Sequence, residues 1–241
     1  MTAKLYGVGL GPGDPDLMSV KANRLVRNTR DIAFFRKAGR SGRACKIVEG
    51  MMPEDAAIFA MEYPVTTEIP LTDPRYNEVL SAFYADCTAH LEALVRSGRD
   101  TVVLCEGDPF FYGSFMHLYT RLKDRIPVEV VPAITGMSAA WTASGAPITW
   151  GDDILSTVMG TLSEDALTRA MTEADALVVM KIGRNLPKVR RALAAAGKAD
   201  RAVLVKYASM EGQEVCRLAD CDAETLPYFS IILVHGQGRR P

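Results

Sequence analysis

Residues 101–113 read TVVLCEGDPFFYG, and this stretch decides the fold class of the chain. Its first part, Thr101–Cys105, is a short continuous run of β-branched and apolar residues, which is typical of a buried parallel strand. Its second part is a loop in which two carboxylates, Glu106 and Asp108, flank Gly107. Because α/β proteins bind ligands beyond the carboxyl ends of parallel strands, we expect a ligand at this loop.

The acidic residues of this loop disfavour a phosphate ligand. Carboxylates repel phosphate, and they attract a cation or the hydroxyl groups of a ligand. The alternative is a solvated turn in which Asp108 caps the next helix. For the Met-containing aromatic segment Phe110–Tyr119, the residue types favour packing over contact with a ligand.

Predicted strands and helices alternate on both sides of this stretch. The strands are expected at residues 4–10, 31–35, 128–131, 154–159, 176–180, 202–205 and 229–234. The helices are expected at about residues 19–28, 74–97, 114–123, 164–173 and 186–196, with Ser19 and Asp73 as caps. The alternation predicts an α/β fold, and turn formers at Ser144–Asp153 predict two domains, residues 1–146 and 147–241.

The charge balance provides no global field that would attract a polyanion. The chain of 241 residues has 28 basic and 29 acidic side chains and a formal net charge of -1, so neither nucleic acid nor a membrane is expected as a partner. Its five cysteines form no Cys-x-x-Cys pair, and its longest apolar segment, residues 228–234, is too short to span a bilayer. Residues 1–10 do not read as a signal peptide, so we expect a cytoplasmic protein.

Residues 7–14 read GVGLGPGD and follow the first predicted strand. They fit neither the dinucleotide-binding pattern G-x-G-x-x-G, in any register, nor a phosphate-binding P-loop. Pro12 has no backbone N–H, and Asp14 and Asp16 add negative charge, which disfavours phosphate. The segment is therefore either a tight turn or a loop that faces another kind of ligand.

Three segments resemble, in order and spacing, the motifs of the tetrapyrrole methylases. They are Tyr6–Pro15 (YGVGLGPGDP), Gly107–Pro109 (GDP) with Gly113, and Val131–Thr135 (VPAIT). Ala133 stands where that family usually has glycine, and alanine would be strained there if the position required a positive φ.

Further segments resemble one branch of this family, the enzymes that methylate precorrin-2 at C-20. They are residues 105–116 (CEGDPFFYGSFM), 62–70 (EYPVTTEIP), 180–185 (MKIGRN) and 227–230 (PYFS). The resemblance covers essentially the whole chain. It implies transfer of a methyl group from S-adenosylmethionine to the C-20 meso carbon of precorrin-2, giving precorrin-3A in cobalamin biosynthesis.

The resemblance also implies an architecture and a set of site residues. It implies a homodimer of two-domain α/β subunits, with S-adenosylmethionine in a cleft between the domains. The residues implied to bind this cofactor are Glu106, Gly107, Asp108, Thr135, Gly136, Met180, Ala208 and Ser209. The residues implied to face the small-molecule tetrapyrrole are Gly11, Pro12, Gly13 and Asp14.

Basic residues are the predicted partners of the carboxylates on the tetrapyrrole. Five of them, with no acidic residue between, lie at Arg36, Lys37, Arg40, Arg43 and Lys46. Arginine can bind a carboxylate through two parallel hydrogen bonds. Lys181 and Arg184 form a second candidate pair. The alternative for the first group, here called the basic cluster, is a solvated flexible loop.

Methyl transfer from a sulfonium requires alignment and exclusion of water more than an activated nucleophile. The methylated carbon must then lose its proton, and Asp108, Glu106 and Tyr112 are the candidate bases, with Asp108 favoured. The three histidines lack metal-ligand spacing, so no metal site is expected.

Other functions stay open at this point. A member of the same family could act on cobalt-factor II, another precorrin position, ribosomal RNA or a protein histidine, and the branch resemblance favours metal-free precorrin-2. A nicotinamide-dependent oxidoreductase is disfavoured by the failed glycine pattern. A non-catalytic tetrapyrrole-binding protein is disfavoured by the full set of motifs.

Overall fold

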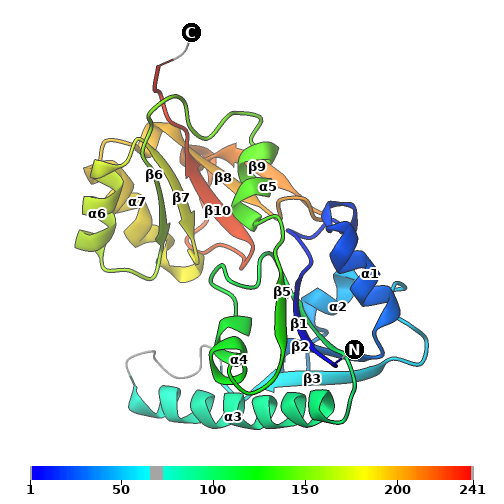
Figure 1. Cartoon of the computed structure of the whole chain (residues 1–241). Helices are drawn as coiled ribbons and strands as arrows, with labels where there is room; N and C mark the ends of the chain where they lie inside the picture. The colour runs from blue at the N-terminus through cyan, green and yellow to red at the C-terminus, as the bar shows by residue number, and fades with distance from the viewer. Residues whose placement is uncertain (1, 66–72, 240–241) are drawn as a thin grey trace. The chain divides into compact units, whose positions relative to one another are not determined.

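The computed structural model describes residues 2–65 and 73–239, and it separates two compact units, Met1–Thr135 and Gly136–Pro241 (Figure 1). Each unit holds one five-stranded sheet with helices packed on it. The predicted α/β fold is therefore confirmed in both units. Within the described residues, no helix combines the length and the hydropathy that a bilayer crossing requires.

The first sheet is entirely parallel, with the strand order β3-β2-β4-β1-β5. Its strands are β1 (Leu5–Gly9), β2 (Asp31–Lys37), β3 (Ala57–Tyr63), β4 (Thr101–Cys105) and β5 (Val128–Val131). All residues of the central strand β4 are buried, as its apolar run predicts. Because the strands run in one direction, the segments that follow them share one edge, called here the carboxyl edge.

Helices cover both faces of this sheet (Figure 1). They are η1 (Pro15–Leu17), α1 (Val20–Asn28), α2 (Arg43–Ile47), α3 (Pro74–Arg96) and α4 (Phe115–Leu122). Successive strand residues point to opposite faces, so Val103 packs with α3 and α4, whereas Val102 and Leu104 pack with α1 and α2.

The signals that predicted the ends of α1 and α3 are confirmed. Ser19 Oγ accepts a hydrogen bond from Ala22 N (3.1 Å), and Asp73 Oδ1 accepts one from Arg75 N (3.0 Å). Gly98 follows α3 with a φ of +87°, a conformation that favours glycine. Local side-chain chemistry therefore sets where these helices start and stop.

The second sheet is mixed, with the strand order β6-β7-β10-β8-β9. Its strands are β6 (Leu155–Met159), β7 (Ala176–Met180), β8 (Ala202–Lys206), β9 (Glu214–Arg217) and β10 (Ser230–Val234). The β6–β7 pair is parallel, and β10 lies antiparallel between β7 and β8. The last strand along the chain is thus the central strand of this sheet.

Helices also cover both faces of the second sheet (Figure 1). On one face, α6 (Glu164–Glu173) and α7 (Leu186–Ala195) pack on Leu177, Leu204 and Ile232. On the other face, α5 (Gly136–Ala143) packs on Val178 and Leu233. Three short 3-10 helices complete the unit: η2 (Gly183–Asn185), η3 (Ala199–Arg201) and η4 (Leu218–Asp220).

The division between the units falls at Thr135–Gly136, and the predicted boundary was at residues 146–147. The difference arises because α5, which the sequence pattern did not predict, packs on strands β8 and β10 of the second sheet. The pattern also missed α2, β3 and β9.

Candidate functional site

The glycine loop after β1 and the acidic loop after β4 pair with each other at the carboxyl edge. Gly107 N donates a hydrogen bond to Gly11 O (2.8 Å), and Leu10 N donates one to Cys105 O (2.9 Å). Gly11 and Gly107 have φ angles of +84° and +66°, a region that side-chain-bearing residues enter at a cost. The two loops therefore form one connected part of the edge.

The three motif segments meet at Gly9. A Cβ atom on Gly9 would lie 2.6 Å from Ala133 Cβ, 2.8 Å from Gly107 O and 2.9 Å from Pro109 Cδ. These distances are shorter than van der Waals contact, so a side chain at position 9 has no room. Glycine at this position is what allows the loops after β1, β4 and β5 to approach each other.

Asp108 joins two of these loops through its carboxylate. Its Oδ1 accepts a hydrogen bond from Phe110 N (2.9 Å), and its Oδ2 accepts one from Ala133 N (3.0 Å). The next helix, α4, has Ser114 at its N-cap, so the alternative interpretation of Asp108 as a helix cap was wrong. Ala133 is not among the residues with positive φ in the described chain, so alanine is unstrained where the family usually has glycine.

Glu106 lies in a different environment from Asp108. It is half-buried, and burial raises the pKa of its carboxyl group, while the Arg43 charge and a backbone hydrogen bond with Ala44 oppose the rise. Glu106 follows β4, and Arg43 and Ala44 begin α2. A partly desolvated carboxylate at a strand end is suited to a cationic ligand or to accepting a proton.

Two aromatic side chains of the acidic loop are on the surface. Phe110 and Tyr112 are each 46% exposed, so these two side chains are not buried in the core. The Phe110 ring lies edge-on to Tyr119 (4.7 Å between centroids), and the Tyr112 ring lies edge-on to Phe111 (4.9 Å). Phe115, the first residue of α4, is by contrast buried.

The predicted substrate residues of the glycine loop differ in exposure. Gly11 and Pro12 are buried, and Gly13 and Asp14 are half-buried. Asp14 Oδ1 accepts a hydrogen bond from Asp16 N (2.9 Å) and so caps η1. This carboxylate therefore has a structural partner within its own turn.

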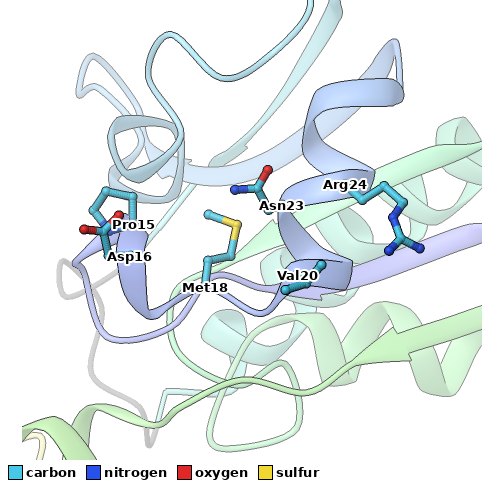
Figure 2. Close-up of a pocket in the computed structure, with 6 residues that line it drawn as sticks. All are labelled: Pro15, Asp16, Met18, Val20, Asn23 and Arg24. Carbon is cyan, nitrogen blue, oxygen red and sulfur yellow. The ribbon is translucent and has the colours of Figure 1, made fainter.

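A cavity of about 330 Å³ lies just after the glycine loop (Figure 2). Pro15 and Asp16 lie on one side of it, Asn23 and Arg24 of α1 lie on the other, and Met18 lies between them. Its lining, completed by Val20, includes none of the residues predicted to bind the substrate or the cofactor.

Most of the basic cluster lies in regular structure. Arg36 and Lys37 end β2, and Arg43 and Lys46 belong to α2, so the alternative of a flexible loop was wrong for these four residues. Arg36 opposes Glu62 across β2 and β3, and its Nη2 lies 2.6 Å from Glu62 Oε1. The other four cluster members, Lys37, Arg40, Arg43 and Lys46, are exposed.

Three of the predicted cofactor residues of the second unit, Gly136, Met180 and Ala208, lie on the face of the sheet that α5 covers. Met180 ends β7, Ala208 follows β8, and both pack in the same apolar cluster as α5. A Cβ atom on Gly136, the first residue of α5, would lie 3.8 Å from Ile231 Cδ1. We call Gly136, Met180, Ala208 and Ile231 the α5-face set.

Ile231 is a member of this set that the sequence reasoning missed. It is half-buried. It directly follows residues 227–230, whose resemblance to the precorrin-2 C-20 methylating enzymes could have pointed to it. Residues 62–70, which also resemble that branch of the family, extend beyond the described residues, which stop at 65 and resume at 73.

Left-handed backbone concentrates at the ends of strands in the described chain. The non-glycine residues with positive φ are Tyr112 (54°), Lys181 (52°), Tyr207 (52°) and Ser209 (59°). They lie on the segments that follow β4, β7 and β8. Strained conformations of this kind cluster at binding sites, and three of these four residues were predicted as site residues from the sequence.

Two serine hydroxyls lack hydrogen-bond partners in the described chain. Ser209 Oγ and Ser230 Oγ are both buried without one. Ser230 alternates with Ile232 and Val234, which pack with α6 and α7, so it lies on the face opposite α5. Ser209 directly follows Ala208 of the α5-face set, so its hydroxyl is a candidate ligand contact.

Lys181 and Arg184, the second candidate pair of basic residues, come soon after Met180 of the α5-face set in the sequence. Lys181 follows β7 directly, Arg184 belongs to η2, and both are exposed.

Within residues 2–65 and 73–239, no group of three or more His, Cys, Asp or Glu side chains could hold a metal ion.

A family model described as Tetrapyrrole (Corrin/Porphyrin) Methylases matches residues 4–220, which is most of the chain and includes all three motif segments. The chain belongs to the tetrapyrrole methylases. This methylase is 46% identical over 238 residues to the precorrin-2 C(20)-methyltransferase of a Sinorhizobium species, with 99% of this chain and 97% of that protein covered.

Two further proteins place the methylase among its relatives. It is 28% identical to the cobalt-precorrin-2 C(20)-methyltransferase of Salmonella typhimurium, with 98% of each protein covered. Its fold matches the solved uroporphyrin-III C-methyl transferase from Thermus thermophilus complexed with S-adenyl homocysteine, with a TM-score of 0.67 and 22% identity. The match covers 96% of this chain and 97% of that one.

Proposed function

We propose that this methylase transfers a methyl group from S-adenosylmethionine to C-20 of precorrin-2, giving precorrin-3A in cobalamin biosynthesis. The observation that carries the proposal is the 46% identity to the Sinorhizobium precorrin-2 C(20)-methyltransferase over nearly the full length of both proteins. The meeting of the three motif segments at Gly9 supports it, because these segments carry the family resemblance.

The proposed cofactor contacts are those that the family resemblance implies. They are Glu106, Gly107, Asp108, Thr135, Gly136, Met180, Ala208 and Ser209. The Glu106 carboxylate offers a negative charge to the sulfonium or ammonium of S-adenosylmethionine. The apolar α5-face set offers contacts to the adenine ring. The solved Thermus structure of the same fold, which holds S-adenyl homocysteine, supports this class of cofactor.

The proposed substrate contacts are the glycine loop and the basic residues. Gly11, Pro12, Gly13 and Asp14 form the loop, and Arg36, Lys37, Arg40, Arg43, Lys181 and Arg184 are the proposed partners of the substrate carboxylates. Within the basic cluster, Arg40 is better placed than Arg36, because the Arg36 guanidinium already pairs with Glu62.

The reaction moves one methyl group and releases one proton. When bound, S-adenosylmethionine supplies the methyl group: its bond from sulfur to the methyl carbon breaks as the bond to C-20 forms, and the sulfonium becomes a neutral thioether. The electron-rich meso carbon provides the electron pair, so the protein contributes alignment and exclusion of water. A base then takes the proton from C-20.

We favour Glu106 over Asp108 as that base. Both oxygens of Asp108 already accept hydrogen bonds from backbone N–H groups, so this carboxylate is engaged in holding two loops together. Burial raises the pKa of Glu106, which makes its carboxylate a stronger base. Tyr112 stays the third candidate.

The metal-free substrate is the preferred one. The identity to the precorrin-2 enzyme is 46%, and that to the cobalt-precorrin-2 enzyme is 28%, at similar coverage.

The methylase is further proposed to act as a homodimer in the cytoplasm. All five cysteines are free thiols, which is typical of a reducing compartment, and light scattering on the purified protein would give its subunit number.

Labelled methyl transfer tests the function. The protein would be incubated with methyl-labelled S-adenosylmethionine and precorrin-2, with and without cobalt in the substrate, and the products examined by mass spectrometry and carbon NMR. We expect one added methyl group at C-20, formed faster on the metal-free substrate. A label at another carbon, or turnover of the cobalt-containing substrate alone, would contradict the proposal.

A further inference from the structure

We infer that Phe110 and Tyr112 form the face on which the flat macrocycle of the substrate lies, an inference that rests on the proposed function. Both side chains follow β4 at the carboxyl edge, and each is 46% exposed. Large apolar side chains left in solvent at a ligand-binding edge mark a contact surface when they are grouped there.

Such grouping is present in the first unit. The large hydrophobic side chains exposed in its described part are Leu17, Val20, Ile58, Val79, Phe110, Tyr112 and Ile134. Five of these follow β1, β4 or β5, and two lie elsewhere, on β3 and α3. Isolated exposed hydrophobics need no explanation, but a preference for the carboxyl edge does.

The loop that presents the two rings is held in place. Phe111 N donates to Asp108 O (3.2 Å), and a Cβ atom on Gly113 would lie 3.1 Å from Pro109 O. Ser114, directly after the loop, accepts a hydrogen bond from the Tyr63 hydroxyl. A rigid pair of rings loses little conformational entropy when a ligand binds to it.

The backbone of Tyr112 adds to this argument. Its φ of 54° is a left-handed conformation that costs a tyrosine free energy and that the surrounding loop must maintain. Tyr112 combines this backbone conformation with a side chain that is 46% exposed. A position that is both strained and exposed is better explained by contact with a ligand than by stability of the fold.

The charges beside the rings match the same ligand. β2 lies next to β4 in the sheet, and it ends in Arg36 and Lys37. The Arg43 charge acts on Glu106, which places α2 beside the acidic loop. A tetrapyrrole has a flat apolar ring system with carboxylates on its rim. Aromatic rings flanked by cations therefore fit both parts of that molecule.

The size of the surface favours a small ligand over a second copy of the chain. Two rings exposed by about half offer roughly 150–250 Å² of contact area. A stable protein interface needs about 800 Å² from each partner. The pair is therefore the size of a docking face for one macrocycle.

Variants at Phe110 test whether the ring contributes to substrate binding without contributing to cofactor binding. Phe110→Leu removes the ring and keeps the apolar bulk, whereas Phe110→Tyr keeps the ring. We expect Phe110→Leu to raise the KM for precorrin-2 by roughly 2- to 10-fold, because an aromatic pair contributes about 0.5–1.5 kcal/mol. Phe110→Tyr should keep the wild-type KM, and the Kd for S-adenosylhomocysteine should be unchanged in both variants.

Two isoleucines provide a matched control. Ile134 follows β5 at the carboxyl edge and is 40% exposed, whereas Ile58 of β3 is 47% exposed. Ile58 lines a hollow with Asp31, Ala57 and Thr101, the first residues of three strands, so it lies at the opposite edge. Ile134→Ala should raise the KM for precorrin-2, and Ile58→Ala should not.

The outcomes separate this inference from the function on which it rests. If the wild type binds S-adenosylhomocysteine and methylates precorrin-2 while Phe110→Leu retains its KM, the inference alone is overturned. It is overturned as well if Phe110→Leu weakens S-adenosylhomocysteine binding by the same factor, or if it changes only the subunit number. A wild type that neither binds S-adenosylhomocysteine nor methylates precorrin-2 overturns the proposed function together with the inference.

Discussion

Glu106 and Asp108 are carboxylates separated by one glycine, and their surroundings give them different chemistry. Asp108 has both oxygens bonded to backbone N–H groups of two loops. Glu106 has a carboxylate whose burial is incompletely compensated, so its pKa is raised. Sequence position could not separate them, because the difference depends on Ala133, Arg43 and Ala44, which come from other parts of the chain.

This difference predicts opposite effects of two amide substitutions on stability. Glu106→Gln should raise the melting temperature at neutral pH, because the amide replaces a carboxylate whose charge is partly desolvated in the folded wild type at that pH. The folded pKa is raised, so this gain should shrink as the pH falls through the folded pKa, and it should vanish below the ordinary glutamate pKa of about 4.3, where both states bind the proton. Thermal unfolding between pH 4 and 8 measures it.

Asp108→Asn is the matched comparison. It removes one acceptor from a carboxylate that bonds two N–H groups, so it should lower the free energy of unfolding by about 1–2 kcal/mol at neutral pH. If instead Asp108→Asn left stability unchanged and abolished turnover with the S-adenosylhomocysteine affinity intact, Asp108 and not Glu106 would be the base.

At the scale of elements, the sequence predicts those whose signals are local. The buried run of β4 and the caps of α1 and α3 are read from neighbouring residues, and the structure confirms them. α5 contains Gly136, Ser138 and Thr142, which favour helix weakly, so it depends on packing against the second sheet. Such packing is not visible in a local pattern.

The other missed elements have related causes. α2 is five residues long and has no side-chain cap, β3 is an edge strand with an exposed Ile58, and β9 is a mostly exposed edge strand. Each lacks the alternation that makes a strand or helix readable. For the site, the motifs located the three loops, but their meeting at Gly9 required the strand order of the folded sheet.

The contact at Gly9 predicts a sharp difference between two glycines. Gly9→Ala should destabilise the first unit by about 1–3 kcal/mol, because the new methyl group overlaps Ala133, Gly107 and Pro109. Gly136→Ala should leave stability unchanged or raise it, because its Cβ would reach only ordinary contact with Ile231. Urea unfolding of both variants measures this, and equal losses would show that the loops can move apart.

At the scale of the whole molecule, charge is balanced overall and uneven locally. The net charge is -1, yet the basic cluster places five cations within residues 36–46 with no acidic residue among them. A global charge near zero cannot steer an anionic substrate, so steering depends on such local groups. This arrangement predicts that the positions of individual cations, and not the total charge of the protein, control the affinity for a polycarboxylate.

A pair of charge reversals tests that statement. Arg40→Glu and Arg169→Glu each change the net charge by the same amount, but Arg169 lies on α6 of the second unit and Arg40 in the basic cluster. We expect Arg40→Glu to raise the KM for precorrin-2 roughly 2- to 5-fold at low salt, with a smaller effect at high salt. Arg169→Glu should retain the wild-type KM, and equal effects would contradict local recognition.

The place of β10 has a consequence for synthesis of the chain. All five strands of the first sheet have emerged by Val131, so that unit can fold while translation continues. The second sheet cannot close until Val234 has emerged, because β10 fills the gap between β7 and β8. A polypeptide interrupted before Ser230 would thus expose two unpaired strand edges, which recruit other chains and lead to aggregation.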